Sequence, residues 1–341
     1  MAQHFLLSSK SRQLSVKKIA RLTDAEAWQE MVTLRWGDSG TQCCPSCGVI
    51  RKHFFLRTRQ QWRCADKECG HTFSVTSGTI FASHKLSLKD ILYAVALYVH
   101  AVKGMSALQL SRHLEIEHKT AYVLFHKLRD ALWTNRDVTP LKDEVEMDGG
   151  YFNYHVRPCN KRENRVDRRS RFNMNPMKRA ILAMRERGEP GEGAKRTVVD
   201  VIKQENERDV SALVNKYVEA GATIFSDEHS CYASLAARHE VKQVNHQEEY
   251  SSVDGVNENQ AESFFARMRR LFSGQIHKCA PKYLLFYANE IAWREDNRRQ
   301  SSLWQFTDLM GKCLRSRQSK NWSKYWQGNH LMEDTLFAAA G

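Results

Sequence analysis

The sequence Cys44-Pro-Ser-Cys47-Gly is followed by a second cysteine pair in the stretch Cys64-Ala-Asp-Lys-Glu-Cys69-Gly. Cysteine pairs on two tight turns can close a tetrahedron of thiolates around one Zn²⁺ ion. Short alternating segments rich in glycine, threonine and aromatic residues surround both pairs and are typical of small strands and turns. The sequence therefore predicts a zinc ribbon over residues 41–80, whose folding depends on a structural Zn²⁺. The predicted ligands are Cys44, Cys47, Cys64 and Cys69.

Two neighbouring residues are alternative zinc ligands: Cys43 could replace Cys44, and His71 could replace Cys69. The chain holds nine cysteines, and the last four along the chain lack the spacing of a metal site. We predict that these four are ordinary thiols. They are Cys159, Cys231, Cys279 and Cys313.

Helical patterns flank the predicted ribbon. Residues 16–36 predict one or two short helices, the second capped by Thr23 or Asp24, within a helical lead. Apolar residues at three- and four-residue spacing predict further helices over residues 86–133. Within that stretch, a short helix from Ser106, a turn near Glu115 and a second helix resemble a helix-turn-helix, although a plain helical hairpin is the alternative. The second helix is predicted to contact DNA through His118, Lys119, Thr120 and Tyr122, with His126 on the same face.

The composition is that of a basic, folded protein. The 341 residues carry 52 Lys+Arg against 39 Asp+Glu, and the net charge of +13 favours a polyanionic partner such as DNA. A hydrophobic content of 42% excludes a disordered chain. The longest apolar run, residues 91–102, is too short to cross a bilayer, and the N-terminal residues lack a signal-peptide pattern. We therefore expect a cytoplasmic, multi-domain protein without a membrane partner.

Three carboxylates stand where a sheet and a helix could bring them together. Asp148 and Asp227 end the strand-like stretches 144–148 and 222–227, and Glu262 lies on a predicted helix. Each residue has a simpler possible role, as a turn residue, a helix cap or a solvated helix residue. Jointly they match the oxygen ligands with which two Mg²⁺ or Mn²⁺ ions catalyse phosphoryl transfer. In a basic chain with two predicted DNA-binding modules, the sequence favours the catalytic interpretation.

Ordered matches over residues 30–300 make this sequence similar to one family. It resembles the bacterial insertion-sequence transposases that join a zinc ribbon to an RNase H-like, DDE-type domain (the ISXO-type group). Towards the N-terminus the resemblance rests on the first cysteine run, Arg35-Trp36, Trp62-Arg-Cys64, Phe73-Ser-Val-Thr-Ser-Gly-Thr-Ile80 and Ser106-Ala-Leu-Gln-Leu-Ser-Arg112. Towards the C-terminus it rests on Glu146-Met-Asp148, Ser226-Asp227, Tyr232, Val244-Asn-His246, Asn259-Gln-Ala-Glu262-Ser-Phe, Tyr287-Ala-Asn-Glu290 and Arg294-Glu-Asp-Asn297-Arg-Arg.

The resemblance implies roles for individual residues. Asp148 and Asp227 match the first two acidic positions of the family. The third position varies in the family between Glu, Asn and His, and Glu262 is our assignment for it, with Asn259 one helical turn earlier as the competitor. The family also favours a basic residue two turns later that holds a DNA phosphate. Arg269 and the adjacent Arg270 fill that place here, where the family has Lys.

The sequence departs from the family in two places. Asp148-Gly-Gly-Tyr151 stands where the family often has Asp-Glu-Thr-Tyr, so an acid is missing there. Residues 157–187 carry eleven Lys/Arg against three acids, which indicates either a grip on DNA phosphates or a solvated loop. His246 stands where the family carries a histidine, and it could act near the scissile phosphate or form a structural hydrogen bond.

The expected fold class is multi-domain α/β. A helical lead (1–40), a zinc ribbon (41–80) and a helix-turn-helix region (81–138) precede an RNase H-like domain, a mixed sheet with helices (140–310), and a basic tail (311–341). The expected function is a DNA transposase that binds the terminal inverted repeats of its insertion sequence and transfers strands into target DNA with Mg²⁺ (or Mn²⁺). The expected partners are transposon ends and target DNA, bound by a homodimer or higher oligomer at the bacterial nucleoid. The alternatives are a domesticated, non-catalytic DNA-binding regulator and a nuclease that cuts without joining.

Overall fold

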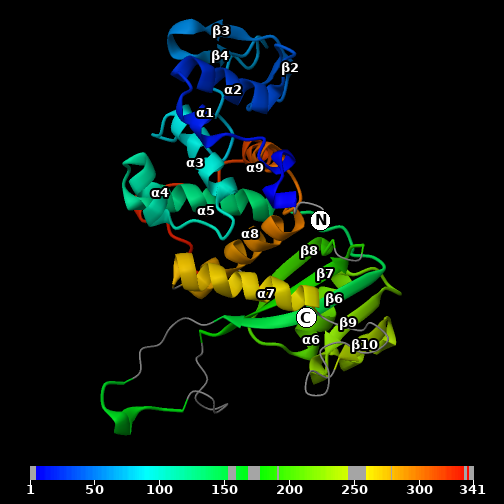
Figure 1. Cartoon of the computed structure of the whole chain (residues 1–341). Helices are drawn as coiled ribbons and strands as arrows, with labels where there is room; N and C mark the ends of the chain where they lie inside the picture. The colour runs from blue at the N-terminus through cyan, green and yellow to red at the C-terminus, as the bar shows by residue number, and fades with distance from the viewer. Residues whose placement is uncertain are drawn as a thin grey trace. The chain divides into compact units, whose positions relative to one another are not determined.

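The computed structural model describes residues 5–152, 159–167, 177–189, 192–244, 259–277, 279–333 and 336–337. The chain divides into two compact units, Met1–Asn135 with Arg299–His330, and Arg136–Arg298 with Leu331–Gly341 (Figure 1). The helix Ser302–Arg315 and the residues that follow it as far as His330 therefore belong to the first unit. The boundary that we expected between residues 310 and 311 falls inside that helix, Ser302–Arg315.

Helices dominate the first unit, and most begin at a side chain that caps free backbone N–H groups. Thr23, one of the two residues expected to cap its helix, is the N-cap and forms a reciprocal capping box with Glu26. Ser87, Ser106 and Ser301 cap three further helices in the same way, each accepting a backbone N–H. The helices predicted over residues 16–36 and 86–133 are confirmed. The helices of this unit are α1 (Val16–Ala20), α2 (Asp24–Trp36), α3 (Leu88–His100), α4 (Ala107–Leu114), α5 (His118–Thr134) and α9 (Ser302–Arg315).

Five short strands form the ribbon of the first unit. β1 (Gln42–Cys43) pairs with β2 (Ile50–Arg51), and β4 (Gln61–Arg63) lies between β3 (Phe54–Leu56) and β5 (Thr72–Phe73), all antiparallel. Helix α2 closes one side of the ribbon, because Trp28 stacks on Trp62 at 5.4 Å and Trp36 meets the same ring edge-on. The Arg35 guanidinium donates hydrogen bonds to the carbonyls of residues 74, 75 and 77. The motif Arg35-Trp36 therefore joins helix and ribbon.

The C-terminal residues of the first unit pack onto its helices. Helix α9 contacts α2, α3 and α5, and its residues Leu309, Met310 and Cys313 are fully buried. Beyond it, Trp322 is only 1% exposed. The residues expected to form a basic tail therefore contribute to the core of the unit as far as Trp322.

A five-stranded sheet organises the second unit, in the order β10-β9-β6-β7-β8. Strands β6, β7 and β8 are antiparallel neighbours, whereas β9 runs parallel to β6 and β10 runs parallel to β9. The strands are β6 (Glu144–Phe152), β7 (Arg179–Arg187), β8 (Ala194–Ile202), β9 (Thr223–Asp227) and β10 (Glu240–Val244). Residues 179–187 correct our expectation of one Arg-rich loop from 157 to 187, because they form a largely buried strand inside the sheet.

Helices cover both faces of this sheet. Helix α6 (Glu207–Tyr217) buries Val210, Leu213 and Val214 against Val145 and Met147 of β6. On the other face, α7 (Asn259–Leu271) lies against β6 and β7, and α8 (Leu284–Asp296) lies against β8 (Figure 1). None of the described helices is both long and apolar enough to cross a membrane.

Two contacts fix α7 on β6. The buried carboxylate of Glu146 accepts hydrogen bonds from the backbone N–H groups of Gln260 (2.8 Å) and Ala261 (3.3 Å), and thereby caps the helix. Farther along the strand, a side chain at Gly150 would overlap the ring of Phe265. Because alternate residues of a strand share a face, Asp148 between these two contacts lies on the face that α7 covers.

Candidate functional site

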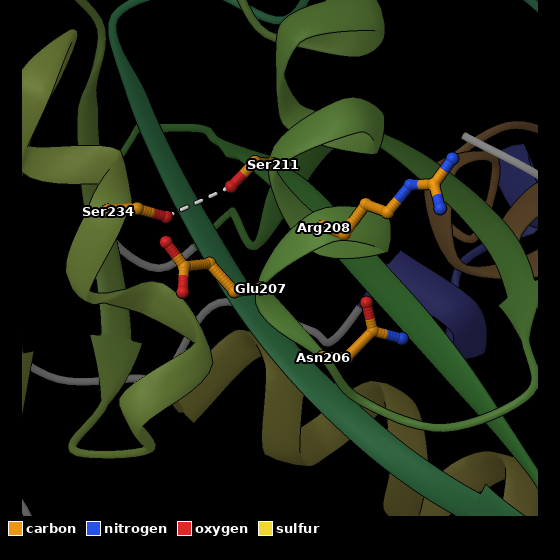
Figure 2. A pocket seen from close by; sticks show the side chains of 5 residues that line it. All are labelled: Asn206, Glu207, Arg208, Ser211 and Ser234. Carbon is orange, nitrogen blue, oxygen red and sulfur yellow. Dashed lines mark hydrogen bonds between the residues drawn. The ribbon is translucent and has the colours of Figure 1, made fainter. Parts of the chain in front are cut away.

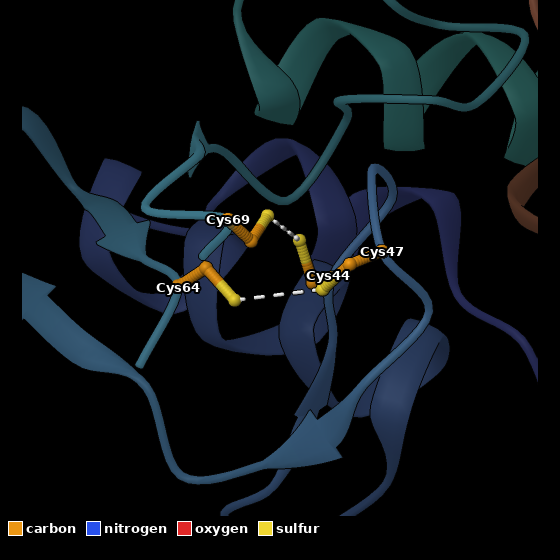
Figure 3. Close-up of side chains that lie close together, drawn as sticks. All are labelled: Cys44, Cys47, Cys64 and Cys69. Carbon is orange, nitrogen blue, oxygen red and sulfur yellow. Dashed lines mark hydrogen bonds between the residues drawn. The ribbon is translucent and has the colours of Figure 1, made fainter. Parts of the chain in front are cut away.

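Four cysteine side chains converge in the ribbon (Figure 3). The Sγ atoms of Cys44 and Cys69 are 3.8 Å apart, and those of Cys47 and Cys64 are 3.7 Å apart. A tetrahedron with metal–sulfur bonds of about 2.3 Å has edges of about 3.8 Å, so the thiols have the spacing of zinc ligands. The structure therefore brings together the four predicted ligands and fits a structural Zn²⁺.

Glycines and backbone hydrogen bonds shape the two cysteine turns. Gly48 and Gly70 have φ of +78° and +53°, a left-handed conformation that favours glycine. The N–H of Gly48 donates to the carbonyl of Cys44, which tightens the first turn. The thiol of Cys43 instead contacts the Gly48 carbonyl at 3.5 Å. Neither Cys43 nor His71 belongs to the cluster.

Helices α4 and α5 are joined by a short turn in which Glu115 has a φ of +52°. His118, Lys119 and Thr120 are exposed in the first turn of α5, on the face predicted to contact DNA. Tyr122 is half-buried, and its ring lies 6.0 Å from the ring of Trp322 and 6.1 Å from that of Tyr325.

His126 corrects the expectation of an open face along α5. Its ring is completely buried and stacks on Trp322, with ring centroids 4.2 Å apart. Burial lowers its pKa well below the ordinary value, and the positive charge of Arg129 adds to this effect. His126 is therefore a packing residue, and only the first turn of the helix remains open on this face.

Asp148 and Asp227 come from neighbouring parallel strands of the second unit. β6 and β9 pair only from Glu144 to Glu146 and from Thr223 to Phe225, so both aspartates follow the paired stretch. Burial raises the pKa of Asp148 to about 7, although the Gly149 N–H donates to its carboxylate at 2.6 Å. The negative charge of Asp227 raises this pKa further. The structure thus brings the two aspartates close enough for their charges to interact.

A third carboxylate beside them was missed by sequence reasoning. Glu205 lies between β8 and α6, and its negative charge also raises the pKa of Asp148. Burial raises the pKa of Glu205 itself, while His229 opposes this and Asp227 adds to it. One ligand atom each from Glu205, His229 and Cys231 lies within 4.8 Å of the other two. No motif pointed to Glu205, because a single glutamate in a connecting loop has no distinctive spacing.

Of the site residues predicted on α7, the structure places Arg269 near Asp148 but does not show, in the part of the chain that it describes, a contact between Glu262 and the two aspartates. Glu262 is exposed in the first turn, and within the described residues no contact joins it to Asp148 or Asp227. The exposed Arg269 lies near enough for its positive charge to oppose the rise in the pKa of Asp148, and Arg270 is exposed beside it. Asn259 is the first residue of the helix. His246, like residues 153–158 and 168–176 of the Arg-rich segment, lies outside the described residues.

An open pocket of about 660 Å³ lies between α6 and the 3₁₀ helix η6 (Ser230–Ala237). Figure 2 shows the five side chains that line it: Asn206, Glu207, Arg208, Ser211 and Ser234. The hydroxyls of Ser211 and Ser234 are 3.0 Å apart and share a hydrogen bond. None of the three clustered carboxylates lines this pocket, so it is separate from the acidic site.

Two aspartates on neighbouring parallel strands therefore lie in one unit, and a four-cysteine ribbon lies in the other. Comparison with known families agrees. Residues 140–296 match the ISXO2-like transposase domain, and residues 22–72 match the transposase zinc-ribbon domain. The chain therefore carries both domains of this transposase family, as the sequence resemblance implied.

A relative supports the same assignment. An uncharacterized protein in transposable element ISH50 of Halobacterium salinarum is 29% identical over 133 residues. The match covers 38% of this chain and 42% of that protein, so the chain is matched to less than half of its relative's length. The relative's place in a transposable element agrees with the two domain matches.

Proposed function

We propose that this protein is a DNA transposase that binds the terminal inverted repeats of its insertion sequence and joins the cleaved ends to target DNA. The observation that carries the proposal is the pair Asp148 and Asp227 on the neighbouring parallel strands β6 and β9, each just beyond the stretch in which the two strands pair, within the ISXO2-like transposase domain. The mixed five-stranded sheet with helices on both faces supports an RNase H-like fold for this domain.

The acidic site has the chemistry of a divalent-metal site. Within the described residues, neither aspartate forms an ion pair with lysine or arginine, and carboxylate oxygens are the ligands that Mg²⁺ and Mn²⁺ prefer. Asp148 and Asp227 would hold the metal, with Glu262 proposed as the third family position and Asn259 as its competitor. Bound metal ions supply activation of the attacking hydroxyl and stabilisation of the leaving oxygen.

The remaining residues of the site would orient the DNA. Arg269, on the exposed side of α7, can hold a phosphate by a bidentate hydrogen bond next to Asp148, and Arg270 can add a second phosphate contact. Strand cleavage by water would leave a 3′-hydroxyl, which would attack target DNA in the same site. Cleavage at paired ends requires at least a dimer.

DNA recognition falls to the first unit in this proposal. The α4–α5 pair supports a helix-turn-helix in which the exposed first turn of α5 enters a major groove. His118, Lys119 and Thr120 would contact phosphates and base edges, and the partly covered Tyr122 would contribute at the margin. The zinc ribbon, which is held rigid by its metal, would add contacts to the same end.

A strand-transfer assay tests the proposal. Purified protein is mixed with DNA that carries the inverted repeats flanking its gene, a target plasmid and Mg²⁺, beside a reaction without metal. We expect joined product only with Mg²⁺ or Mn²⁺. Binding without cleavage on intact ends would favour the non-catalytic regulator, and cleavage without joining would favour the nuclease.

A further inference from the structure

The residues that follow α9, from 316 to 330, form a C-terminal segment of the first unit that has no part in the proposed function so far. The segment holds three Lys/Arg and no acidic residue, and it lies beyond residue 296, where the match to the transposase domain ends. We propose that the C-terminal segment binds the sugar-phosphate backbone of duplex DNA beside the groove that α5 enters. The inference rests on the proposed function, in which α5 contacts DNA.

Two contacts set the C-terminal segment on the middle of α5. The Asn321 side chain donates to a carboxylate oxygen of Asp130 at 3.5 Å, and the ring of Trp322 stacks on that of His126 with centroids 4.2 Å apart. Trp322 is only 1% exposed, so this stacking belongs to the core of the unit. His126 and Asp130 are one helical turn apart and share a face of α5. The segment therefore follows that face along the helix.

The next residues of the segment reach the first turn of α5, which would enter a major groove in the proposed function. The ring of Tyr325 lies 6.1 Å from the ring of Tyr122 and 5.6 Å from the ammonium group of Lys119. Beside it, Trp326 is 71% exposed, and its ring lies 6.0 Å from the ammonium group of Lys85. Contact with a partner would remove the apolar surface of this indole from water. An open aromatic ring therefore lies next to the residues predicted to contact DNA.

Four exposed lysines give this surface a positive charge. They are Lys85 and Lys119 beside the two rings, and Lys320 and Lys324 within the segment. Among the residues that the structure describes, none of the four forms an ion pair with an acidic side chain. Ammonium groups that are not neutralised within the protein suit the phosphates of duplex DNA, because their binding releases condensed counterions. The charge therefore favours DNA as the partner of this surface.

Hydrogen bonds hold the two lysines of the segment in a folded loop. The side-chain amide of Asn329 donates to the carbonyls of Lys320 and Ser323, at 3.2 Å and 2.7 Å. The backbone N–H of Asn329 donates to the carbonyl of Lys324 at 3.3 Å. A loop that is folded before its partner arrives loses less conformational entropy on binding than a flexible one does. The segment is thus arranged as a surface and not as a loose basic tail.

DNA binding by the full-length, zinc-loaded protein tests this inference. Fluorescence anisotropy follows two labelled duplexes over a series of salt concentrations. One carries the inverted repeat that flanks the gene, and the other has the same composition in scrambled order. The double variant Lys320→Gln with Lys324→Gln should bind both duplexes about tenfold more weakly, and its slope of log affinity against log salt should be shallower by about two. Trp326→Ala should weaken binding to both duplexes about three- to tenfold and leave that slope unchanged.

Matched controls remove the same groups from other exposed places. The double variant Lys142→Gln with Lys216→Gln takes two exposed lysines from the second unit, and Trp304→Ala takes a 43% exposed indole from the first turn of α9. Both controls should bind the two duplexes within about twofold of wild type. Circular dichroism and thermal melting check that the variants fold, and we expect near-wild-type Tm values because every replaced side chain is exposed.

The variant Lys119→Gln separates this inference from the proposed function. If it weakens binding to the end duplex while the variants of the C-terminal segment bind like the controls, α5 contacts DNA and the segment does not. If wild type binds neither duplex, or if Lys119→Gln and the segment variants all bind like the controls, both the inference and DNA recognition by α5 are contradicted. Tighter binding by Trp326→Ala would overturn the inference, because the segment would then obstruct α5. An equal loss in the second-unit control would also overturn it, because the effect would then reflect net charge alone.

Discussion

At the scale of single residues, the surroundings of Asp148 disfavour its charge in the metal-free protein. Burial and the nearby charges of Asp227 and Glu205 raise its pKa to about 7. In an unfolded chain an aspartate titrates near 3.9, so the folded state binds the proton more tightly. The contribution of Asp148 to stability is therefore complete below about pH 4 and is lost as the pH rises through about 7. Ionised Asp148 therefore lowers the stability of the metal-free protein at neutral and higher pH, and this loss is its cost to the fold.

Asp148→Asn should remove that cost. At pH 8 without divalent metal, we expect the variant to melt on the order of 2–5 °C above wild type, while at pH 4 the two should melt together. Thermal unfolding followed by circular dichroism at both pH values measures the difference. The same variant should lose strand transfer. If the Tm of the variant at pH 8 were equal to or below that of wild type, the description of this site would be contradicted.

The sequence was sufficient to predict which side chains lie close together at some places in the two candidate sites and not at others. The nearness of Asp148 and Asp227 could be predicted because each follows an apolar strand-like run and the two strands are parallel neighbours. The expected strand end at Asp148 was wrong, because β6 continues to Phe152. The nearness of Glu205 could not be predicted, because its position depends on how the β8–α6 connection returns beneath Gly149. The choice of Cys44 over Cys43 also needed coordinates, since only the turn geometry decides which thiol faces the metal.

Zinc content distinguishes the two adjacent cysteines. Cys44→Ser should release the metal and unfold the ribbon, because a structural zinc site supplies much of the folding free energy of so small a domain. Cys43→Ser should retain one equivalent of Zn²⁺, since its thiol lies outside the cluster. Elemental analysis measures the metal, and the fluorescence of Trp28, Trp36 and Trp62 reports on the ribbon. Zinc loss from Cys43→Ser with retention in Cys44→Ser would reverse the assignment.

At the scale of elements, the C-terminal residues of the first unit stabilise α5. Trp322 is 1% exposed and stacks on the buried His126, whereas Trp326 a few residues later is 71% exposed. Trp322→Ala should lower the free energy of unfolding by about 3–5 kcal/mol, and Trp326→Ala should change it by about 0.5 kcal/mol or less. Urea denaturation of both variants compares them. Equal effects would mean that the stacking on His126 contributes little.

Local patterns predicted the helices of the first unit and part of the sheet. Strand β7 was obscured because its apolar core, Ala180 to Met184, lies between arginines that made the whole segment look solvated. The burial of His126 was also missed, since its partner Trp322 is remote in sequence and weakly patterned. Such long-range packing leaves no periodic signal in either segment.

At the scale of the whole molecule, the two candidate sites lie in different units. The first unit holds the zinc ribbon and the α4–α5 pair, and the second holds the acidic site. The net charge of +13 on the whole chain favours a polyanionic partner such as DNA. In our account, end recognition and phosphoryl transfer are thus divided between them, and joining the two ends needs more than one copy of the chain.

The most direct test of this account is strand transfer by matched aspartate variants. Wild type, Asp148→Ala, Asp227→Ala and the control Glu219→Ala are compared on end-containing DNA with Mg²⁺. Glu219 is exposed and precedes β9 at the end opposite Asp227, so its variant should join strands at the wild-type rate. Both aspartate variants should bind the ends normally and form on the order of a thousandfold less joined product. Joining by either aspartate variant at the wild-type rate would contradict the central claim that these two carboxylates perform the chemistry.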